Sequence, residues 1–165
     1  LIPGFIEAAT IWENKGGVCD IGTEQSPIDI DTNDVYLVPG AQPFVFINYN
    51  KTSLTVHLDH HTVKLIPSGT LAVGVAAGGI RGFYALDHIH FHWSSEHSFN
   101  GNRFPLEVHF VHYNSIYPNL EAALSDPGGV AVIAVLFSEG SKSSAIRDLT
   151  EDVEQLRING GSVTS

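Results

Sequence analysis

Residues 88–112, HIHFHWSSEHSFNGNRFPLEVHFVH, decide the fold of this chain. Histidine alternates with Ile, Phe and Trp through residues 88–93, which predicts a strand because successive strand side chains point to opposite faces. Residues 106–112 alternate in the same way and predict a second strand. Between them lie Asn100 and Gly101, a pair that favours a tight hairpin turn. The segment therefore predicts two neighbouring antiparallel strands.

The polar faces of these two strands carry ligands that suit a metal ion. His88, His90 and His92 share one face of the first strand, and Glu107 and His109 share one face of the second. We expect His90, His92 and His109 to converge on one ion. Three neutral imidazoles leave the fourth tetrahedral position open, as in catalytic zinc sites. Glu107 is placed to accept the other N–H of His109, which is the usual support for a ligating histidine.

The remaining histidines have simpler interpretations. His112 lies on the opposite face from His109, and we expect it to be a hydrogen-bonded core residue. We expect the same of His97. His60 and His61 lie in a predicted turn and are expected to be exposed.

Outside this pair of strands the chain also reads as mostly β-structure. Residues 44–47, 54–58 and 62–66 are short strand-like stretches separated by turn residues. Residues 130–137 form one continuous apolar run, which predicts a strand buried on both faces. Apolar residues recur at helical spacing only within 144–158. The sequence therefore predicts a mainly β (α+β) fold with a few helices.

Composition narrows the class of protein. The 165 residues, 43% of them hydrophobic, suit one folded domain. A net charge of −10 disfavours nucleic acid as a partner. No apolar run approaches the roughly 20 residues of a membrane-spanning helix. Because the chain has one cysteine, Cys19, and no methionine, we expect a processed product or a fragment without an internal disulfide.

The motifs together resemble those of the α-class carbonic anhydrases. The matching segments are HFHW at 90–93, SEH at 95–97 and EVHFVH at 107–112, with QSPIDI at 25–30 upstream. The resemblance runs from about Trp12 to the end of the chain. It implies a large, mostly antiparallel central sheet with short helices. It also implies that residues 1–165 are a single domain truncated at its C-terminal side.

The resemblance implies zinc-dependent, reversible hydration of carbon dioxide to bicarbonate and a proton. It assigns His90, His92 and His109 as the Zn²⁺ ligands and Glu107 as the residue that holds His109. Glu96 becomes a buried acid that orients the reacting oxygen. Val111 and Val132 become the apolar wall of the substrate pocket.

Proton transfer is where this sequence departs from that family. The position of the family's shuttle histidine falls on Thr52, which cannot carry a proton at neutral pH. The resemblance implies that Thr55 faces the cleft, and strand parity puts His57 on the same face, so we expect His57 at the rim, where a histidine can pass protons to buffer. His88 stands where the family usually has glutamine, so it could orient His90 by a hydrogen bond or act as a base. Glu96, His57 and His88 are thus the candidate catalytic residues.

The setting and partners follow from the same resemblance. We expect a secreted or extracellular protein whose signal peptide has been removed. Asn50 begins the chain's N-x-[ST] sequon and is a candidate glycosylation site. A second polypeptide, or another copy of this chain, would complete the sheet.

Two other functions remain open from the sequence. One is a carbonic-anhydrase-like protein with little or no activity and a matrix or binding role. The other is a cupin-type metal enzyme with iron or manganese, because His90, His92 and Glu96 fit the spacing H-x-H-x₃-E. The glycine spacing after Glu96 does not suit a cupin.

Overall fold

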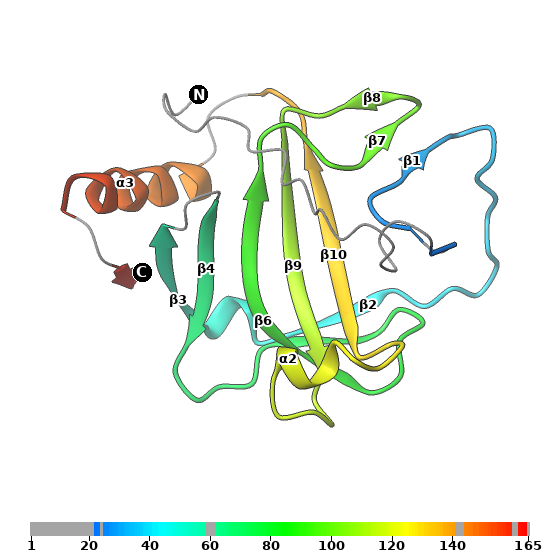
Figure 1. Ribbon diagram of the computed structural model, residues 1–165, viewed down its shortest axis with the longest axis horizontal. Coiled ribbons are helices and arrows are strands. Elements are labelled where there is room, and N and C mark those ends of the chain that lie inside the picture. Colours follow the sequence, from blue (N-terminus) through cyan, green and yellow to red (C-terminus); the bar gives the residue numbers. More distant parts are fainter. Residues whose placement is uncertain (1–21, 24, 59–61, 141–143, 160–161, 165) are drawn as a thin grey trace.

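A computed structural model of the chain describes residues 22–23, 25–58, 62–140, 144–159 and 162–164. Its centre is an eight-stranded antiparallel sheet in which six strands follow the order β10-β9-β6-β4-β3-β11, and β5 also pairs with β6 and with β2 (Figure 1). These strands are β2 (Phe44–Ile47), β3 (Ser53–Leu58), β4 (Val63–Ser68), β5 (Gly74–Ala77), β6 (Phe83–His92), β9 (Leu106–Asn114), β10 (Val130–Phe137) and β11 (Ser162–Thr164). The predicted mainly antiparallel β fold is confirmed.

The remaining elements of the structure are short strands and helices outside this sheet. They are β1 (Asp29–Ile30), the 3-10 turn η1 (Tyr49–Lys51), β7 (Ser98–Phe99), β8 (Asn102–Arg103), α2 (Leu120–Ala123) and α3 (Ser144–Asn159). The predicted turn is confirmed, since Asn100 and Gly101 both adopt positive φ and connect β7 to β8. Within the segment QSPIDI at 25–30 only β1 is a strand, and it pairs in parallel with β7.

A β-bulge in β6 sets which side chains face the core. Tyr84 and Leu86 are buried before the bulge, whereas Ile89 is buried after it. The register against β9 shifts between Leu86 and His88, and a bulge adds one residue that changes the alternation. Without that shift the histidines would share a face with Tyr84 and Leu86. The sequence pattern alone did not reveal this bulge.

The hydrophobic core lies between the sheet and α3. Ile89 and Phe91 of β6 and Val56 of β3 cluster with Val153 and Leu156 of the helix. Figure 1 shows α3 beside β3 and β4. The helix begins and ends within one residue of the predicted range 144–158, so this prediction is confirmed. The core covers one face of the sheet, and the histidines of β6 lie on the other.

The prediction that 130–137 is buried on both faces is wrong. Within the described residues, β10 pairs only with β9 and forms an edge of the sheet. Val132, Val135 and Phe137 are 51%, 38% and 36% exposed. The continuous apolar composition gave no information about which strands flank it. β11 was not predicted either; it pairs with β3 at the other end of the sheet.

Candidate metal centre

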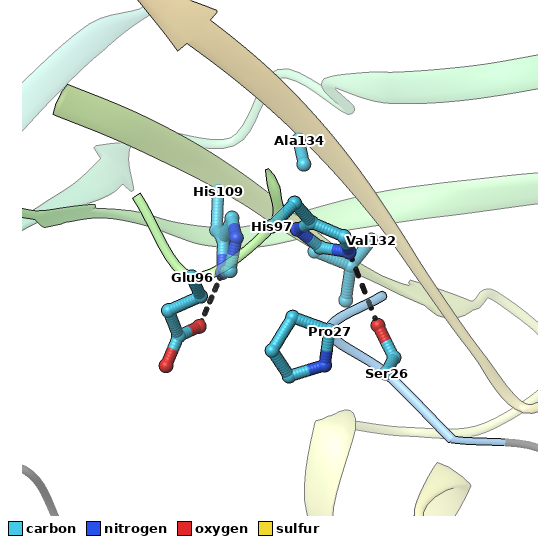
Figure 2. Close-up of a pocket in the computed structure, with 7 residues that line it drawn as sticks. All are labelled: Ser26, Pro27, Glu96, His97, His109, Val132 and Ala134. Carbon is cyan, nitrogen blue, oxygen red and sulfur yellow. Dashed lines mark hydrogen bonds and ion pairs between the residues drawn. The ribbon is translucent and has the colours of Figure 1, made fainter. Parts of the chain in front are cut away.

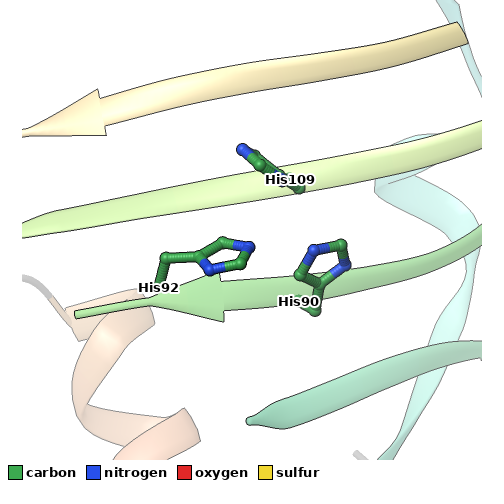
Figure 3. Close-up of side chains that lie close together, drawn as sticks. All are labelled: His90, His92 and His109. Atoms are coloured by element: carbon green, nitrogen blue, oxygen red, sulfur yellow. The ribbon is translucent and has the colours of Figure 1, made fainter. Parts of the chain in front are cut away.

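Three histidines from two adjacent strands gather on the sheet face opposite the core. His90 and His92 project from β6, and His109 is the direct register partner of His90 on β9. Their ring centroids are 4.6–5.1 Å apart, and Figure 3 shows the rings turned toward one another. One nitrogen from each ring lies within 4.8 Å of the others. The structure thus brings together the predicted ligand set.

The free nitrogens of this cluster suit a bound cation. Among the described residues, His90 Nδ1 and His92 Nε2 are buried side-chain atoms without a hydrogen-bond partner. A buried polar atom left unpaired is costly, so a ligand is expected there. Burial, together with the neighbouring His109, lowers the pKa of both histidines, that of His90 to about 3. Both rings therefore stay neutral near pH 7, the form in which imidazole binds metals.

Glu107 is the anchor beneath the third ligand. Its side chain is fully buried, and Oε1 accepts hydrogen bonds from His109 Nε2 at 2.6 Å and from His97 Nδ1 at 2.5 Å. Oε2 accepts the His97 backbone N–H at 2.9 Å. Burial alone would raise the pKa of Glu107, but these hydrogen bonds outweigh it and hold the pKa at about 2. Because an ionised carboxylate only accepts, His109 Nε2 carries the proton and Nδ1 keeps its lone pair for a metal.

A pocket opens beside this network at the β10 edge of the sheet. Its volume is about 230 Å³. Figure 2 shows the side chains that line it: Ser26, Pro27, Glu96, His97, His109, Val132 and Ala134. His109 belongs both to this pocket and to the histidine cluster, so the pocket reaches the candidate metal centre.

A row of side chains crosses the sheet through the metal centre. His57 on β3 is opposite Lys64 on β4, Lys64 is opposite His90, and His90 is opposite His109. Ala134 on β10 is opposite His109. Neighbouring strands lie about 4.8 Å apart, so two strand spacings separate the backbones of His57 and His90. His57 is half-buried on the metal-bearing face.

Comparison of the sequence with known protein families agrees with a metal centre of this kind. Residues 7–165 match the family described as eukaryotic-type carbonic anhydrase. The chain belongs to this family. Carbonic anhydrases are in general zinc-dependent, and the three histidines here are positioned to hold a metal. The cupin alternative is wrong, because the family match covers nearly the whole chain.

Individual carbonic anhydrases are similar to this chain over most of its length. Human carbonic anhydrase 7 is 32% identical over 147 residues, covering 84% of this chain and 56% of that protein. Mouse carbonic anhydrase 6 is 30% identical over 165 residues, covering 93% of this chain and 51% of that protein. The chain thus spans about half the length of the carbonic anhydrases it matches.

Glu96 differs from the expectation for this carbonic anhydrase chain. It was predicted to be a buried acid, but 40% of its side chain is exposed. Glu96 follows the end of β6 and borders the pocket at the open edge of β10, where its side chain remains partly exposed. Its Oε2 is 3.3 Å from His92 Nε2 and 3.8 Å from His109 Nδ1, close to the ligand nitrogens.

His88 also differs from one of its predicted roles. It does not orient His90 by a hydrogen bond, because His90 Nδ1 has no such partner. His88 Nδ1 instead lies 2.6 Å from Asp87 Oδ2, and the His88 ring stacks on the His90 ring with centroids 5.1 Å apart. The bulge in β6 places Asp87 next to His88 in this way. Sequence reasoning did not single out Asp87.

Other sequence-based assignments can be placed in the structure. His112 is fully buried and hydrogen-bonded to Tyr49 Oη and to the Ala131 carbonyl, which confirms it as a core residue. His97 is hydrogen-bonded as predicted, but it also lines the pocket. Val132 is opposite Val111 on the metal-bearing face. Cys19, His60, His61 and Trp12 lie outside the described residues.

Two more residues at the site had no clear signal in the sequence. Lys64 joins the metal-bearing row only through the register between β4 and β6. Ser26 reaches the pocket because the chain before β1 folds back beside His97. In the described part of the chain, no helix is long and apolar enough to cross a membrane.

Proposed function

We propose that this chain forms the zinc-binding part of an enzyme that reversibly hydrates carbon dioxide to bicarbonate and a proton. The observation that carries the proposal is the convergence of three imidazoles, two of which have buried nitrogens without a hydrogen-bond partner. Three histidine ligands leave a position for a reacting water, as in catalytic zinc sites. Family membership supports carbon dioxide and bicarbonate as the substrates.

The chain's own residues have separate tasks in this proposal. His90, His92 and His109 would hold Zn²⁺, which when bound lowers the pKa of a water ligand and so supplies a nucleophile near neutral pH. Glu107 fixes the ring of His109 and its tautomer. Glu96, whose Oε2 lies 3.3 Å from His92 Nε2, would orient the reacting oxygen at the edge of the site. Val111 and Val132, paired across β9 and β10, offer an apolar surface for carbon dioxide.

The proposal is tested on metal-stripped chain restored with one equivalent of zinc. We expect tight zinc binding and zinc-dependent hydration in a stopped-flow assay with a pH indicator. Metal analysis that finds iron or manganese in place of zinc would contradict the proposal. Tight zinc binding without hydration, even in the completed protein described below, would favour the alternative of an inactive matrix or binding protein. The exposure of Glu96 and Val132 is the observation that favours this alternative.

We further propose that the β10 edge is covered by a second polypeptide or by another copy of this chain. All eight residues of β10 are uncharged, and three of its large apolar side chains are exposed. A long apolar edge strand without charged residues is a template for pairing with another strand. Covering it would also close the pocket around Val132 and Ala134.

Whether another chain covers the β10 edge can be tested by measuring the mass of the protein particle in solution. We expect native material to have a mass above that of one chain, and its subunit composition distinguishes a second polypeptide from another copy. Val135→Lys should abolish the association, because a charge on an edge strand opposes pairing. Ile116→Lys is the matched control, since Ile116 is 75% exposed and belongs to the connection between β9 and α2, not to β10. Native material that consists of single chains would overturn the proposal.

His57 is proposed as the group that passes protons to solvent. It lies on the metal-bearing face, two strands from His90, with Lys64 between them. In the active, completed protein, His57→Ala should lower turnover in weak buffer and leave zinc content unchanged. Imidazole buffer should restore much of the lost turnover, because it replaces the missing proton carrier. Wild-type turnover of the variant in weak buffer would exclude His57 as the carrier.

We also propose that the protein is secreted and that Asn50 carries a glycan. Asn50 lies in η1 and is exposed, which is what glycosylation requires. Mass spectrometry of the peptide containing Asn50 from native material would test this.

A further inference from the structure

Lys64 is the only lysine or arginine in the eight described strands of the central sheet. It lies on β4 directly opposite His90 of β6, and the two strands are antiparallel. Side chains that are directly opposite in such a pair share one face of the sheet, with Cβ atoms about 4.5–5.5 Å apart. In a chain with a net charge of −10, this half-buried residue therefore places a positive charge beside a predicted metal ligand.

The two sides of the metal centre differ in charge. Toward β10 the pocket is lined by the apolar Val132 and Ala134, and Glu96 adds a carboxylate there. Toward β4 the neighbouring side chain is the cationic Lys64. Its charge reaches the ligands, since burial is the main reason for the low pKa of His90 and the charge of Lys64 lowers that pKa further. An uncharged molecule suits the β10 side, whereas an anion suits the β4 side.

The carboxylates beside the histidines agree with this division. Asp87 Oδ2 lies 2.6 Å from His88 Nδ1, so this carboxylate already has a partner. Glu107 is fully buried and accepts three N–H groups. Glu96 is partly exposed and borders the pocket, on the side away from Lys64. Among the described residues, the placement of these acids therefore favours the approach of an anion from the β4 side.

We propose that Lys64 is a specificity-determining residue that increases the affinity of the metal centre for small anions, bicarbonate above all. The inference rests on the proposed function, in which bicarbonate is a substrate and three histidines leave one position of the metal open. A lysine side chain is a flexible four-carbon stem that ends in three N–H donors. From the position opposite His90 this stem can bring its ammonium group to an anion at the open position. Lys64 thus selects among ligands and does not itself bind the metal.

The experiment measures ligand binding to the full chain loaded with Co²⁺, whose visible absorption changes when a ligand occupies the open position. Thiocyanate and bicarbonate are the anionic probes, and imidazole is the uncharged probe. Lys64→Gln should weaken the binding of both anions about tenfold, because one positive charge near a partly buried site is lost. Its affinity for imidazole should equal that of the wild type. Lys64→Arg keeps the charge and should keep the affinity for anions, and Lys64→Met replaces Lys64→Gln if the latter fails to fold.

Arg81→Gln is the matched control, because Arg81 is exposed between β5 and β6 and its loss changes the net charge by the same unit. We expect this variant to bind thiocyanate and bicarbonate as the wild type does. Unchanged anion affinity in Lys64→Gln, an equal loss in Arg81→Gln, or an equal loss for imidazole would each overturn the inference. Failure to bind metal is detected before any anion is added and overturns the proposed function as well. A metal-loaded chain that binds anions through Lys64 but does not hydrate carbon dioxide would contradict the proposed function alone.

Discussion

Replacing His109 with alanine is expected to lower the affinity for zinc by orders of magnitude and to abolish hydration. His109 is the only ligand from β9, so its loss leaves two imidazoles on one strand and an incomplete site. The loss should exceed the roughly 10–100-fold cost of removing only the hydrogen-bond partner of a ligand. His92→Ala should have an equally large effect. Competition titration against a zinc chelator measures the affinity, and metal analysis after dialysis measures retention.

His57→Ala provides the matched control for this experiment. His57 lies in the same cross-strand row as His109, so the variant also removes an imidazole from the metal-bearing face. His57 is not among the residues whose ring nitrogens converge on the metal centre. The zinc affinity of His57→Ala should therefore equal that of the wild type. Equal zinc content in wild type and His109→Ala would refute the site.

Glu107→Gln is expected to weaken both zinc binding and the fold itself. The carboxylate accepts three N–H groups in a fully buried position, and an amide has only one oxygen to offer them. The NH₂ group of the glutamine must therefore face one of these N–H donors without a hydrogen bond, or the ring of His97 or His109 must change to its other tautomer. On His109 that tautomer places the proton on Nδ1, the nitrogen needed for the metal. We expect zinc affinity to fall roughly 10–100-fold.

The metal-free stability of Glu107→Gln should fall as well. A buried polar group left without its partner costs about 1–3 kcal/mol, so the urea midpoint should decrease. Glu121→Gln is the control, because Glu121 is exposed in the first turn of α2. A surface substitution of this kind usually changes stability by less than about 0.5 kcal/mol. If Glu107→Gln matched Glu121→Gln in both zinc affinity and midpoint, Glu107 would not be the anchor of the site.

Much of the metal centre could be predicted because it depends on local rules. Strand alternation places His90 and His92 on one face whatever the rest of the fold does. The Asn100–Gly101 turn makes the return strand antiparallel, and parity then places Glu107 and His109 together. Helical spacing likewise determined the range of α3. In each case the information lies within about 25 consecutive residues.

Other features were decided by the tertiary structure, because they depend on register between distant segments. The bulge in β6 joins two alternation patterns that the sequence shows as one, and it pairs Asp87 with His88. The apolar composition of β10 predicted burial, but its place at the sheet edge leaves it exposed, since composition does not specify strand order. Ser26 meets His97 across 71 positions of sequence, and Lys64 enters the metal-bearing row only through the pairing of β4 with β6. Local residue types thus determined the chemistry of the ligands, whereas long-range pairing determined which other groups surround them.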